Sequence, residues 1–207
     1  MNPLQKTQET YSRIAADYAA TWHKGGTVEH HLQRFAALLP EGATVMDVGC
    51  GPGLDSVVLQ SHHLNVIGLD YSHEMMRVGR DEHNCRVPLV QADMRCLPVR
   101  QPLDGIWASA SLLHLQRDDM LPTLQEFWRV LKPNGVLYLS VKQGAGEDWV
   151  RTEKYGHDLP RFFTFWQPET LDPLLETAAF QIIDGFEEQG ARDRWVVRYA
   201  RKEEPKP

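Results

Sequence analysis

Short apolar runs alternate with amphipathic segments along most of the chain. Runs of apolar and β-branched residues predict buried strands over 45–48, 65–69, 87–90, 103–109 and 136–141. Apolar residues at helical spacing predict helices between these strands, over 54–60, 72–81 and 119–131. Strands that alternate with helices are typical of an α/β protein built on a doubly wound parallel sheet.

An aromatic helical face precedes the first predicted strand. Within residues 7–22 it consists of Tyr11, Ile14, Ala15, Tyr18 and Trp22. Their spacing predicts one helix, which either packs into the core or covers a ligand as a lid. We expect Gly25-Gly26 to break this helix and a second helix to run over 28–39.

The pattern changes after the fifth predicted strand. Residues 143–158 are polar and contain glycine, so we expect a loop there. The rest of the chain predicts an aromatic stretch over 161–166, a helix over 168–178, strands over 181–187 and 194–200, and a frayed, charged tail from Lys202.

A glycine-rich turn follows the first strand. Residues 45–56 read Val-Met-Asp-Val-Gly-Cys-Gly-Pro-Gly-Leu-Asp-Ser. Gly49, Gly51 and Gly53 alternate, which lets the backbone turn tightly and approach a ligand without an intervening Cβ. The free N–H groups at the start of the next helix point back at this turn. Strand, turn and helix together predict a nucleotide-type binding site.

The spacing of the glycines distinguishes two ligand classes. A dinucleotide fold needs Gly-x-Gly-x-x-Gly, but the third glycine position holds Leu54. The chain instead has an acidic residue followed by Gly-x-Gly-x-Gly, beginning at Asp47. This motif resembles the first motif of the class I S-adenosylmethionine-dependent methyltransferases. A second point of resemblance is Leu-Lys-Pro-Asn-Gly over 131–135, followed by an apolar strand.

The resemblance implies both a fold and a cofactor. The fold is a Rossmann-like, doubly wound, seven-stranded α/β sheet that ends in an antiparallel strand pair. The cofactor is S-adenosylmethionine, with S-adenosylhomocysteine as its product. The implied cofactor-binding residues are Asp47, Gly49, Gly51, Gly53, Asp70, Tyr71, Asp93, Met94, Ala108 and Ser109.

Two carboxylates are central to the expected cofactor site. Asp70 ends the second strand, 17 residues after Gly53, where ligands bind in doubly wound sheets. We expect it to bind the ribose hydroxyls, and the alternative is a helix N-cap or turn acid. In the resembled family an aspartate at the position of Asp93 accepts the adenine amino group, and the backbone N–H of the next residue, here Met94, meets a ring nitrogen. The alternative for Asp93 is a solvated loop acid.

The methyl acceptor is expected beside His114, which follows the fourth strand where the resemblance places the transfer. A neutral imidazole there either takes a proton from the acceptor or forms a wall of the site. The expected substrate-side residues are Tyr11, Tyr18, Arg161, Phe163 and Trp166. Arg161 suits an anionic group on the substrate, whereas core packing is the alternative for the aromatic residues.

Composition limits the partners and the compartment. The net charge of -6 argues against a general nucleic-acid binder. Three cysteines without Cys-x-x-Cys spacing indicate free thiols, and no apolar run reaches the length of a membrane span. With no signal-peptide core at the start, we expect a cytoplasmic protein. His30-His31 and His62-His63 lack metal-ligand spacing, so we expect surface residues and no metal site.

No linker or repeat divides the chain, so we expect a single domain over 1–207. It comprises a helical lid over 1–40, a cofactor-binding core over 41–142, and a substrate-side segment with closing strands over 143–201.

The sequence thus predicts a methyltransferase that acts on a small molecule by in-line transfer. Ser109-Ala110-Ser111-Leu112 stands where amino-group DNA methyltransferases carry Asn/Asp-Pro-Pro-Tyr, and no Pro-Cys pair suits transfer to cytosine C5. A non-catalytic cofactor-binding activator subunit and a nucleotide-dependent oxidoreductase are the alternatives. Neither the acceptor nor the oligomeric state follows from the sequence.

Overall fold

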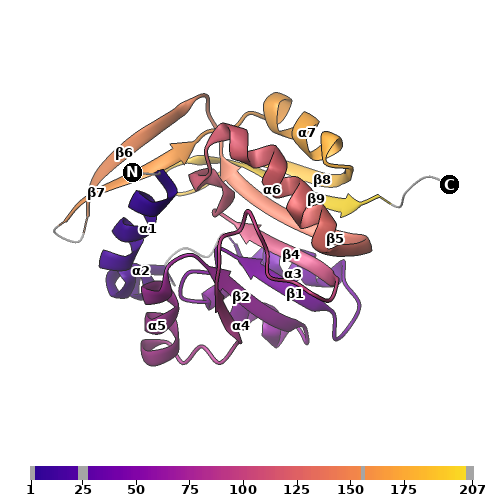
Figure 1. The fold of residues 1–207 in the computed structure, drawn as a ribbon, viewed down its shortest axis with the longest axis horizontal. Coiled ribbons are helices and arrows are strands. Elements are labelled where there is room, and N and C mark those ends of the chain that lie inside the picture. Colours follow the sequence, from indigo (N-terminus) through magenta and orange to yellow (C-terminus); the bar gives the residue numbers. More distant parts are fainter. Residues whose placement is uncertain (1–2, 23–27, 155–156, 204–207) are drawn as a thin grey trace.

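A seven-stranded mixed sheet forms the centre of the computed structural model, which describes residues 3–22, 28–154 and 157–203 (Figure 1). Its strand order is β3-β2-β1-β4-β5-β9-β8. The first five strands are parallel: β1 (Thr44–Val48), β2 (Asn65–Asp70), β3 (Leu89–Gln91), β4 (Leu103–Ser109) and β5 (Leu131–Lys142). β9 (Arg194–Lys202) pairs antiparallel with both β5 and β8 (Phe180–Gln189). This order confirms the Rossmann-like sheet and the closing antiparallel pair.

Helices cover both faces of the sheet, because alternate residues of each strand point to opposite sides. On one face, Val45, Trp107 and Tyr138 pack with residues of α3 (Glu29–Ala37) and α4 (Leu54–Ser61). On the other face, Met46 and Ile106 pack with residues of α6 (Arg117–Val130) and α7 (Pro168–Thr177). The remaining long helix, α5 (His73–Glu82), follows β2. Burial of these two apolar clusters holds the strand ends in fixed positions.

The predicted N-terminal helix is divided into α1 (Pro3–Arg13) and α2 (Ala15–Trp22). Ile14 lies between them and is 2% exposed. The rings of Tyr11 and Tyr18 still meet edge to face, with centroids 5.6 Å apart. The predicted break at Gly25-Gly26 lies outside the described residues.

Two strand boundaries differ from the prediction. β3 begins at Leu89 instead of Val87, and Pro88, which has no N–H to donate, accepts from Gly68 through its carbonyl at 2.9 Å. β5 begins at Leu131, before the expected Pro-Asn-Gly turn, and its pairing with β4 shifts register there. Asn134 has a φ of 62°, so the turn residues form an irregularity within the strand.

The prediction of a loop over 143–158 is wrong. β6 (Glu147–Lys154) and β7 (His157–Thr164) form an antiparallel hairpin outside the main sheet. The composition of β6 is polar, and its pairing depends on β7, which supplies buried apolar residues. Across the hairpin, the rings of Trp149 and Phe162 meet with centroids 5.6 Å apart. Because β6 is stabilised mainly by pairing with β7, its own sequence shows only a weak strand pattern.

α1 covers the edge of β7 that faces away from β6. Thr10 Oγ1 donates to the carbonyl of Pro160 at 2.8 Å, and the N–H of Phe162 donates to Thr7 Oγ1 at 3.0 Å. Two threonine hydroxyls therefore satisfy backbone groups of a strand edge and connect the hairpin to the N-terminal helix.

Two side chains that were expected on the surface or in a frayed tail are buried. His31 is 2% exposed and lies beneath β8 and β9, where it contacts Tyr199 and Glu188. Lys202 is 8% exposed, and its Nζ donates to the carbonyls of Trp128 and Leu131 at the end of α6. Burial lowers the pKa of Lys202. In both cases polar partners from distant segments offset the cost of burial.

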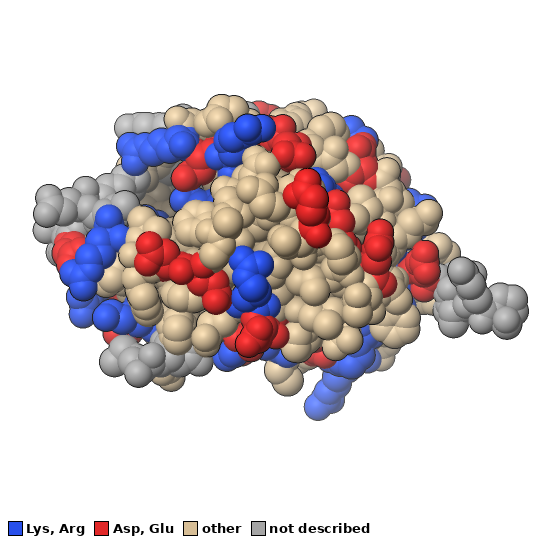
Figure 2. Space-filling model, turned by 90° about the horizontal axis from the view of Figure 1, so that it is seen from above, with Lys and Arg blue, Asp and Glu red and all other residues tan. Residues whose placement is uncertain are grey.

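Charges of both signs are interspersed on the face shown in Figure 2, with no continuous basic field on that face. No helix of the described residues is long and apolar enough to cross a membrane.

Candidate active site

A cavity lies at the carboxyl ends of β1, β2 and β4, next to α1 and α2. It contains about 860 Å³ of space free of protein atoms, part of which is open to solvent. Doubly wound sheets bind ligands at this edge. The expected site residues that line it are Asp47, Gly49, Gly51, Asp70, Tyr71, Met94, Ser109, Tyr11, Tyr18 and His114.

The glycine turn shapes one wall of the cavity. The N–H groups of Gly49 and Cys50 both donate to the carbonyl of Leu69, at 2.7 and 3.0 Å. Gly49 has a φ of 75°, and a Cβ there would lie 2.3 Å from the Cβ of Ser111. Gly53 has a φ of 77°, lies against Cys85 outside the cavity, and begins α4. Both positions therefore require glycine.

Asp70 supports the glycine turn from the end of β2. Its Oδ2 accepts from the N–H of Gly51 at 2.8 Å, and its Oδ1 accepts from the N–H of Ser72 at 2.7 Å. Burial raises the pKa of Asp70, and the N–H bonds oppose that rise. An ionised carboxylate has about four lone-pair sites, so these bonds leave acceptor capacity for a ligand in the cavity.

Asp47 connects β1 to the helix after the turn. It is buried, and Ser56 Oγ donates to its Oδ2 at 2.5 Å. Burial raises the pKa of Asp47 well above its usual value, and the charge of Asp55 adds to this effect. The acid thus positions α4 as well as lining the cavity.

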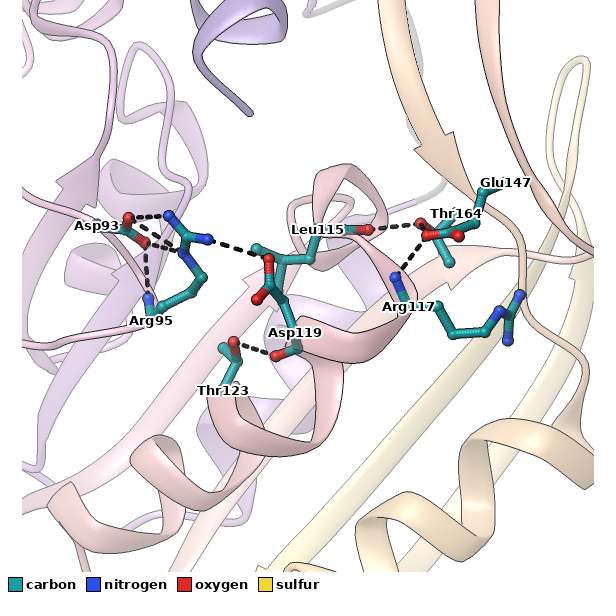
Figure 3. Close-up of polar contacts among 8 residues, drawn as sticks. All are labelled: Asp93, Arg95, Leu115, Arg117, Asp119, Thr123, Glu147 and Thr164. Atoms are coloured by element: carbon teal, nitrogen blue, oxygen red, sulfur yellow. Dashed lines mark hydrogen bonds and ion pairs between the residues drawn. The ribbon is translucent and has the colours of Figure 1, made fainter. Parts of the chain in front are cut away.

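Asp93 lies outside the cavity and is bound by Arg95 (Figure 3). Its carboxylate accepts from the backbone N–H of Arg95 at 2.9 Å and from the guanidinium at 2.7 Å. Arg95 also donates to Asp119 of α6 at 3.0 Å. Burial alone would raise the pKa of Asp93, but the bonds from Arg95 outweigh it and hold that pKa below its usual value. This network anchors the loop that brings Met94 to the cavity.

His114 is buried, and both of its ring nitrogens have hydrogen-bond partners. Nδ1 lies 2.7 Å from the carbonyl oxygen of Phe162, which only accepts, so Nδ1 carries the proton. Nε2 therefore accepts from the hydroxyl of Tyr11 at 3.0 Å. Burial lowers the pKa of His114 to about 3, and the charges of Arg161 and Lys142 contribute to this shift. The imidazole is thus neutral at physiological pH.

The segment that carries His114 is anchored to the hairpin (Figure 3). It forms the short 3-10 helix η1 (Leu112–His114). Beyond it, Thr164 Oγ1 donates to the carbonyl of Leu115 at 2.5 Å, and the N–H of Arg117 donates to Glu147 at 2.5 Å. The hairpin and the end of β4 are therefore one connected structure around the imidazole.

Several expected site residues lie behind the cavity wall. Arg161 stands over the rings of Tyr11 and Phe163, at 5.7 and 5.3 Å, and donates to the hydroxyl of Tyr11 at 3.4 Å. Phe163 is 3% exposed and lies 4.8 Å from His114, between ring centroids. Trp166 is 1% exposed and packs in the core, as does Ala108. These residues support the wall instead of lining the cavity.

Several lining residues were missed by the sequence analysis. Ser111 follows β4 by two residues, so its place at a strand end was a usable signal. Its buried Oγ has no hydrogen-bond partner among the described residues. The others reach the cavity from α1, the glycine turn, the starts of α4 and α5, and the position directly after β4: Leu4, Thr7, Gln8, Cys50, Pro52, Leu54, Asp55, Ser72, Met75 and Ala110.

The wall fits a ligand with both polar and apolar parts. Asp70 offers acceptors, Ser111 offers a hydroxyl, and the glycine turn lets a ligand approach the backbone. Met75, Met94 and the ring of Tyr18 supply apolar surface. A nucleoside joined to an amino-acid-like chain, such as S-adenosylmethionine, matches this combination.

Residues 45–135 match the family model for the methyltransferase domain. Trans-aconitate 2-methyltransferase from Azoarcus sp. (strain BH72) is 36% identical over 53% of this chain, which spans 43% of that relative. Malonyl-[acyl-carrier protein] O-methyltransferase from Herminiimonas arsenicoxydans is 29% identical over 94% of this chain and 72% of the relative.

The fold is also similar to that of a solved methyltransferase. The 1,6-didemethyltoxoflavin-N1-methyltransferase of Burkholderia thailandensis, solved with 1,6-didemethyltoxoflavin and S-adenosylhomocysteine, superposes with a TM-score of 0.64 at 23% identity. The match covers 99% of this chain and 92% of that one.

Proposed function

Because the chain belongs to the class I S-adenosylmethionine-dependent methyltransferases, we propose that it transfers a methyl group to a small molecule bound beside His114. The observation that supports this most is the cavity itself, in which Asp70 and the glycine turn face His114 across the ends of parallel strands. The comparisons favour this function over an oxidoreductase or a non-catalytic subunit.

The proposed cofactor site uses residues of the cavity wall. When bound, S-adenosylmethionine supplies a methyl group on a sulfonium, which is a good leaving group. We assign the ribose hydroxyls to Asp70 and the adenine side to Met94, with Gly49 and Gly51 beside the amino-acid chain. Asp93 and Arg95 then act by fixing the loop of Met94.

We propose that α1 and α2 form a lid. Thr7, Gln8, Tyr11 and Tyr18 line the cavity from these helices, so the helices form part of its wall. Water exclusion by the lid strengthens electrostatic interactions inside the site. Because Thr7 also bonds to β7, movement of the lid is coupled to the hairpin.

The acceptor is proposed to be a carboxylate. Nδ1–H of His114 donates to the carbonyl of Phe162, and the lone pair of Nε2 accepts from the hydroxyl of Tyr11. The low pKa of His114 also makes it a weak base. An acceptor that needs no deprotonation at neutral pH suits such a site, and a carboxylate is already ionised there. Positioning alone can supply about 7–11 kcal/mol.

The charges around His114 support an anionic acceptor. Arg161 lies beside Tyr11, and Lys142 lies over the ring of Phe163 at 4.4 Å, while its ammonium also pairs with Asp193. Burial is the main cause of the low pKa of His114, and the positive charges of Arg161 and Lys142 lower that pKa further. The names of two relatives, for trans-aconitate and malonyl-[acyl-carrier protein], also denote carboxylic acids.

A turnover screen tests the proposed function. The protein is incubated with S-adenosylmethionine and with separate pools of di- and tricarboxylic acids, amines, and phenols, and S-adenosylhomocysteine is quantified. We expect product with the acid pool. Product with amines or phenols alone would contradict the carboxylate, and cofactor binding without turnover in any pool would favour a non-catalytic subunit.

We also propose a cytoplasmic location. The structure has Cys50, Cys85 and Cys96 as free thiols, which suits a reducing compartment. Cell fractionation with a compartment marker tests this proposal.

A further inference from the structure

Three potential metal ligands meet between α3 and the edge strand β8. They are His30 and His31, adjacent on α3, and Glu188, near the end of β8. His31 Nε2 lies 2.9 Å from Glu188 Oε1, and His30 Nε2 lies 3.9 Å from Glu188 Oε2. All the ligand atoms are within 4.8 Å of one another. The cluster is separate from the cavity described above, since none of its residues lines that cavity.

The hydrogen bonds of His31 leave its Nε2 facing a carboxylate. The hydroxyl of Tyr199 lies 2.8 Å from Nδ1 of His31 and 3.3 Å from the backbone carbonyl of His31, to which it can donate. Without a cation, Nδ1 can accept from this hydroxyl while Nε2–H donates to Glu188 at 2.9 Å. In the other neutral tautomer, Nδ1–H donates to the oxygen of Tyr199, and the lone pair of Nε2 and the carboxylate of Glu188 can bind one cation between them.

The second partner of His31 matches the usual surroundings of a metal ligand. A metal-bound histidine almost always donates its other ring N–H to an oxygen, which fixes the tautomer and the ring orientation. Tyr199 provides that oxygen. The hydroxyl is itself held by the helix backbone, so the lone pair of Nε2 has a fixed direction.

The spacing of the ligand atoms suits a small divalent ion. Zinc bonds to imidazole nitrogen and carboxylate oxygen at about 2.0–2.2 Å, which places tetrahedral ligands ~3.3 Å apart. The observed separations of 2.9 and 3.9 Å lie on either side of this value. His30 and Glu188 have side-chain exposures of 60% and 32%, so small rotations of these two would complete the geometry while His31 stays fixed.

The surroundings give the site one buried side and one open side. The rings of Tyr138 and Phe186 lie 5.5 and 6.0 Å from that of His31, between centroids. The exposed side at His30 leaves room for entry and for water ligands. Arg34 stands over the ring of Tyr199 at 5.3 Å, but its charge is paired with Asp184.

We propose that His30, His31 and Glu188 bind one divalent transition-metal ion of the zinc type and so link α3 to the edge strand β8. Two imidazoles and one carboxylate favour zinc, cobalt or nickel, whereas magnesium and calcium prefer oxygen ligands. Water completes the coordination, as in other sites with three protein ligands.

Isothermal titration of the full chain, free of any affinity tag and carrying Cys96→Ser, with zinc chloride tests the site. The substitution removes an exposed thiol that could bind zinc itself. We expect one equivalent to bind, and at least tenfold weaker binding in His30→Gln and Glu188→Gln. The matched control is the double variant His62→Gln/His63→Gln, an adjacent histidine pair elsewhere on the chain, which should bind as tightly as its parent.

A second measurement identifies the ligands. Cobalt(II) in a four- or five-coordinate site of nitrogen and oxygen ligands gives visible absorption bands, which we expect with the parent and the control but not with Glu188→Gln. No binding of zinc, or equal binding by the His30→Gln, Glu188→Gln and control variants, would overturn the proposal and leave His31 and Glu188 as a proton-bridged pair.

Discussion

His114 donates its Nδ1 proton to the backbone carbonyl of Phe162 over 2.7 Å. This bond fixes the imidazole tautomer and joins the end of β4 to the hairpin strand β7. The N–H of the same Phe162 donates to Thr7 of α1. One residue of β7 therefore contacts both the proposed lid and the proposed transfer site, so hairpin, lid and imidazole are held together.

His114→Ala should lower kcat by the same factor at every pH between 6 and 8. Because the pKa of His114 is about 3, the imidazole is fully neutral across this range and its protonation does not change. Removing a residue that only positions an ionised acceptor has the same effect at each pH. A general base contributes about 10²–10⁴-fold while the acceptor is still protonated, and this contribution falls as rising pH ionises the acceptor. Rate profiles of wild type and variant with one acceptor check this. A loss of kcat that shrinks as the pH rises would instead indicate that His114 acts as a general base.

Asp70→Ala should weaken binding of S-adenosylhomocysteine by about 10–150-fold, or about 1.5–3 kcal/mol. The variant loses the proposed acceptor for the ribose and also releases the N–H groups of Gly51 and Ser72. Calorimetric titration measures the affinity. Asp81→Ala is a suitable control, since its carboxylate pairs with Arg77 on an exposed part of α5. Equal affinities in both variants would mean that the ribose is bound elsewhere.

Much of the fold could be predicted because the central parallel strands β1 and β4 are buried on both faces. Such strands have continuous apolar runs, and β1 and β4 were predicted to within one residue for this reason. β6 has no comparable run, because its stability comes from pairing with β7 and from the packing of α1 on that strand. Contacts between segments so far apart leave no local pattern.

The site was predictable where the motif is local and was missed where distant segments meet. Gly49, Gly51 and Asp70 follow from short-range spacing, and all three line the cavity. By contrast, the ion pair of Asp93 with Arg95 depends on side-chain geometry, and the core position of Trp166 depends on where α7 packs. Burial of His31 likewise depends on two strands at the far end of the chain.

Gly49→Ala should destabilise the protein far more than Gly42→Ala. Both residues have a positive φ, 75° and 73°, so both substitutions incur the left-handed backbone cost of about 1–2 kcal/mol. Only at Gly49 would the new Cβ also clash, 2.3 Å from Ser111, since at Gly42 the nearest atom is 4.0 Å away. Urea denaturation gives the two free energies of unfolding. Similar losses would show that the turn adapts to a side chain.

Cofactor binding should slow amide hydrogen exchange in α1 and α2. If these helices form a lid, the bound ligand stabilises their closed position, which reduces local opening. Exchange of the full chain is measured with and without S-adenosylhomocysteine, and α7, which does not line the cavity, serves as the internal reference. Unchanged protection in both helices would favour simple core packing of Tyr11 and Tyr18.

The measurement that tests the central proposal most directly identifies the kind of bond formed between the methyl group and the acceptor. The protein is incubated with S-adenosylmethionine labelled in the methyl group and with the acid pool, and the product is then treated with mild alkali. Methyl esters hydrolyse under these conditions and release volatile labelled methanol, whereas N-methyl groups and methyl ethers remain intact. We expect the label to become volatile, as a carboxylate acceptor beside His114 requires. Label that is transferred to a product and stays non-volatile after alkali would contradict the proposal.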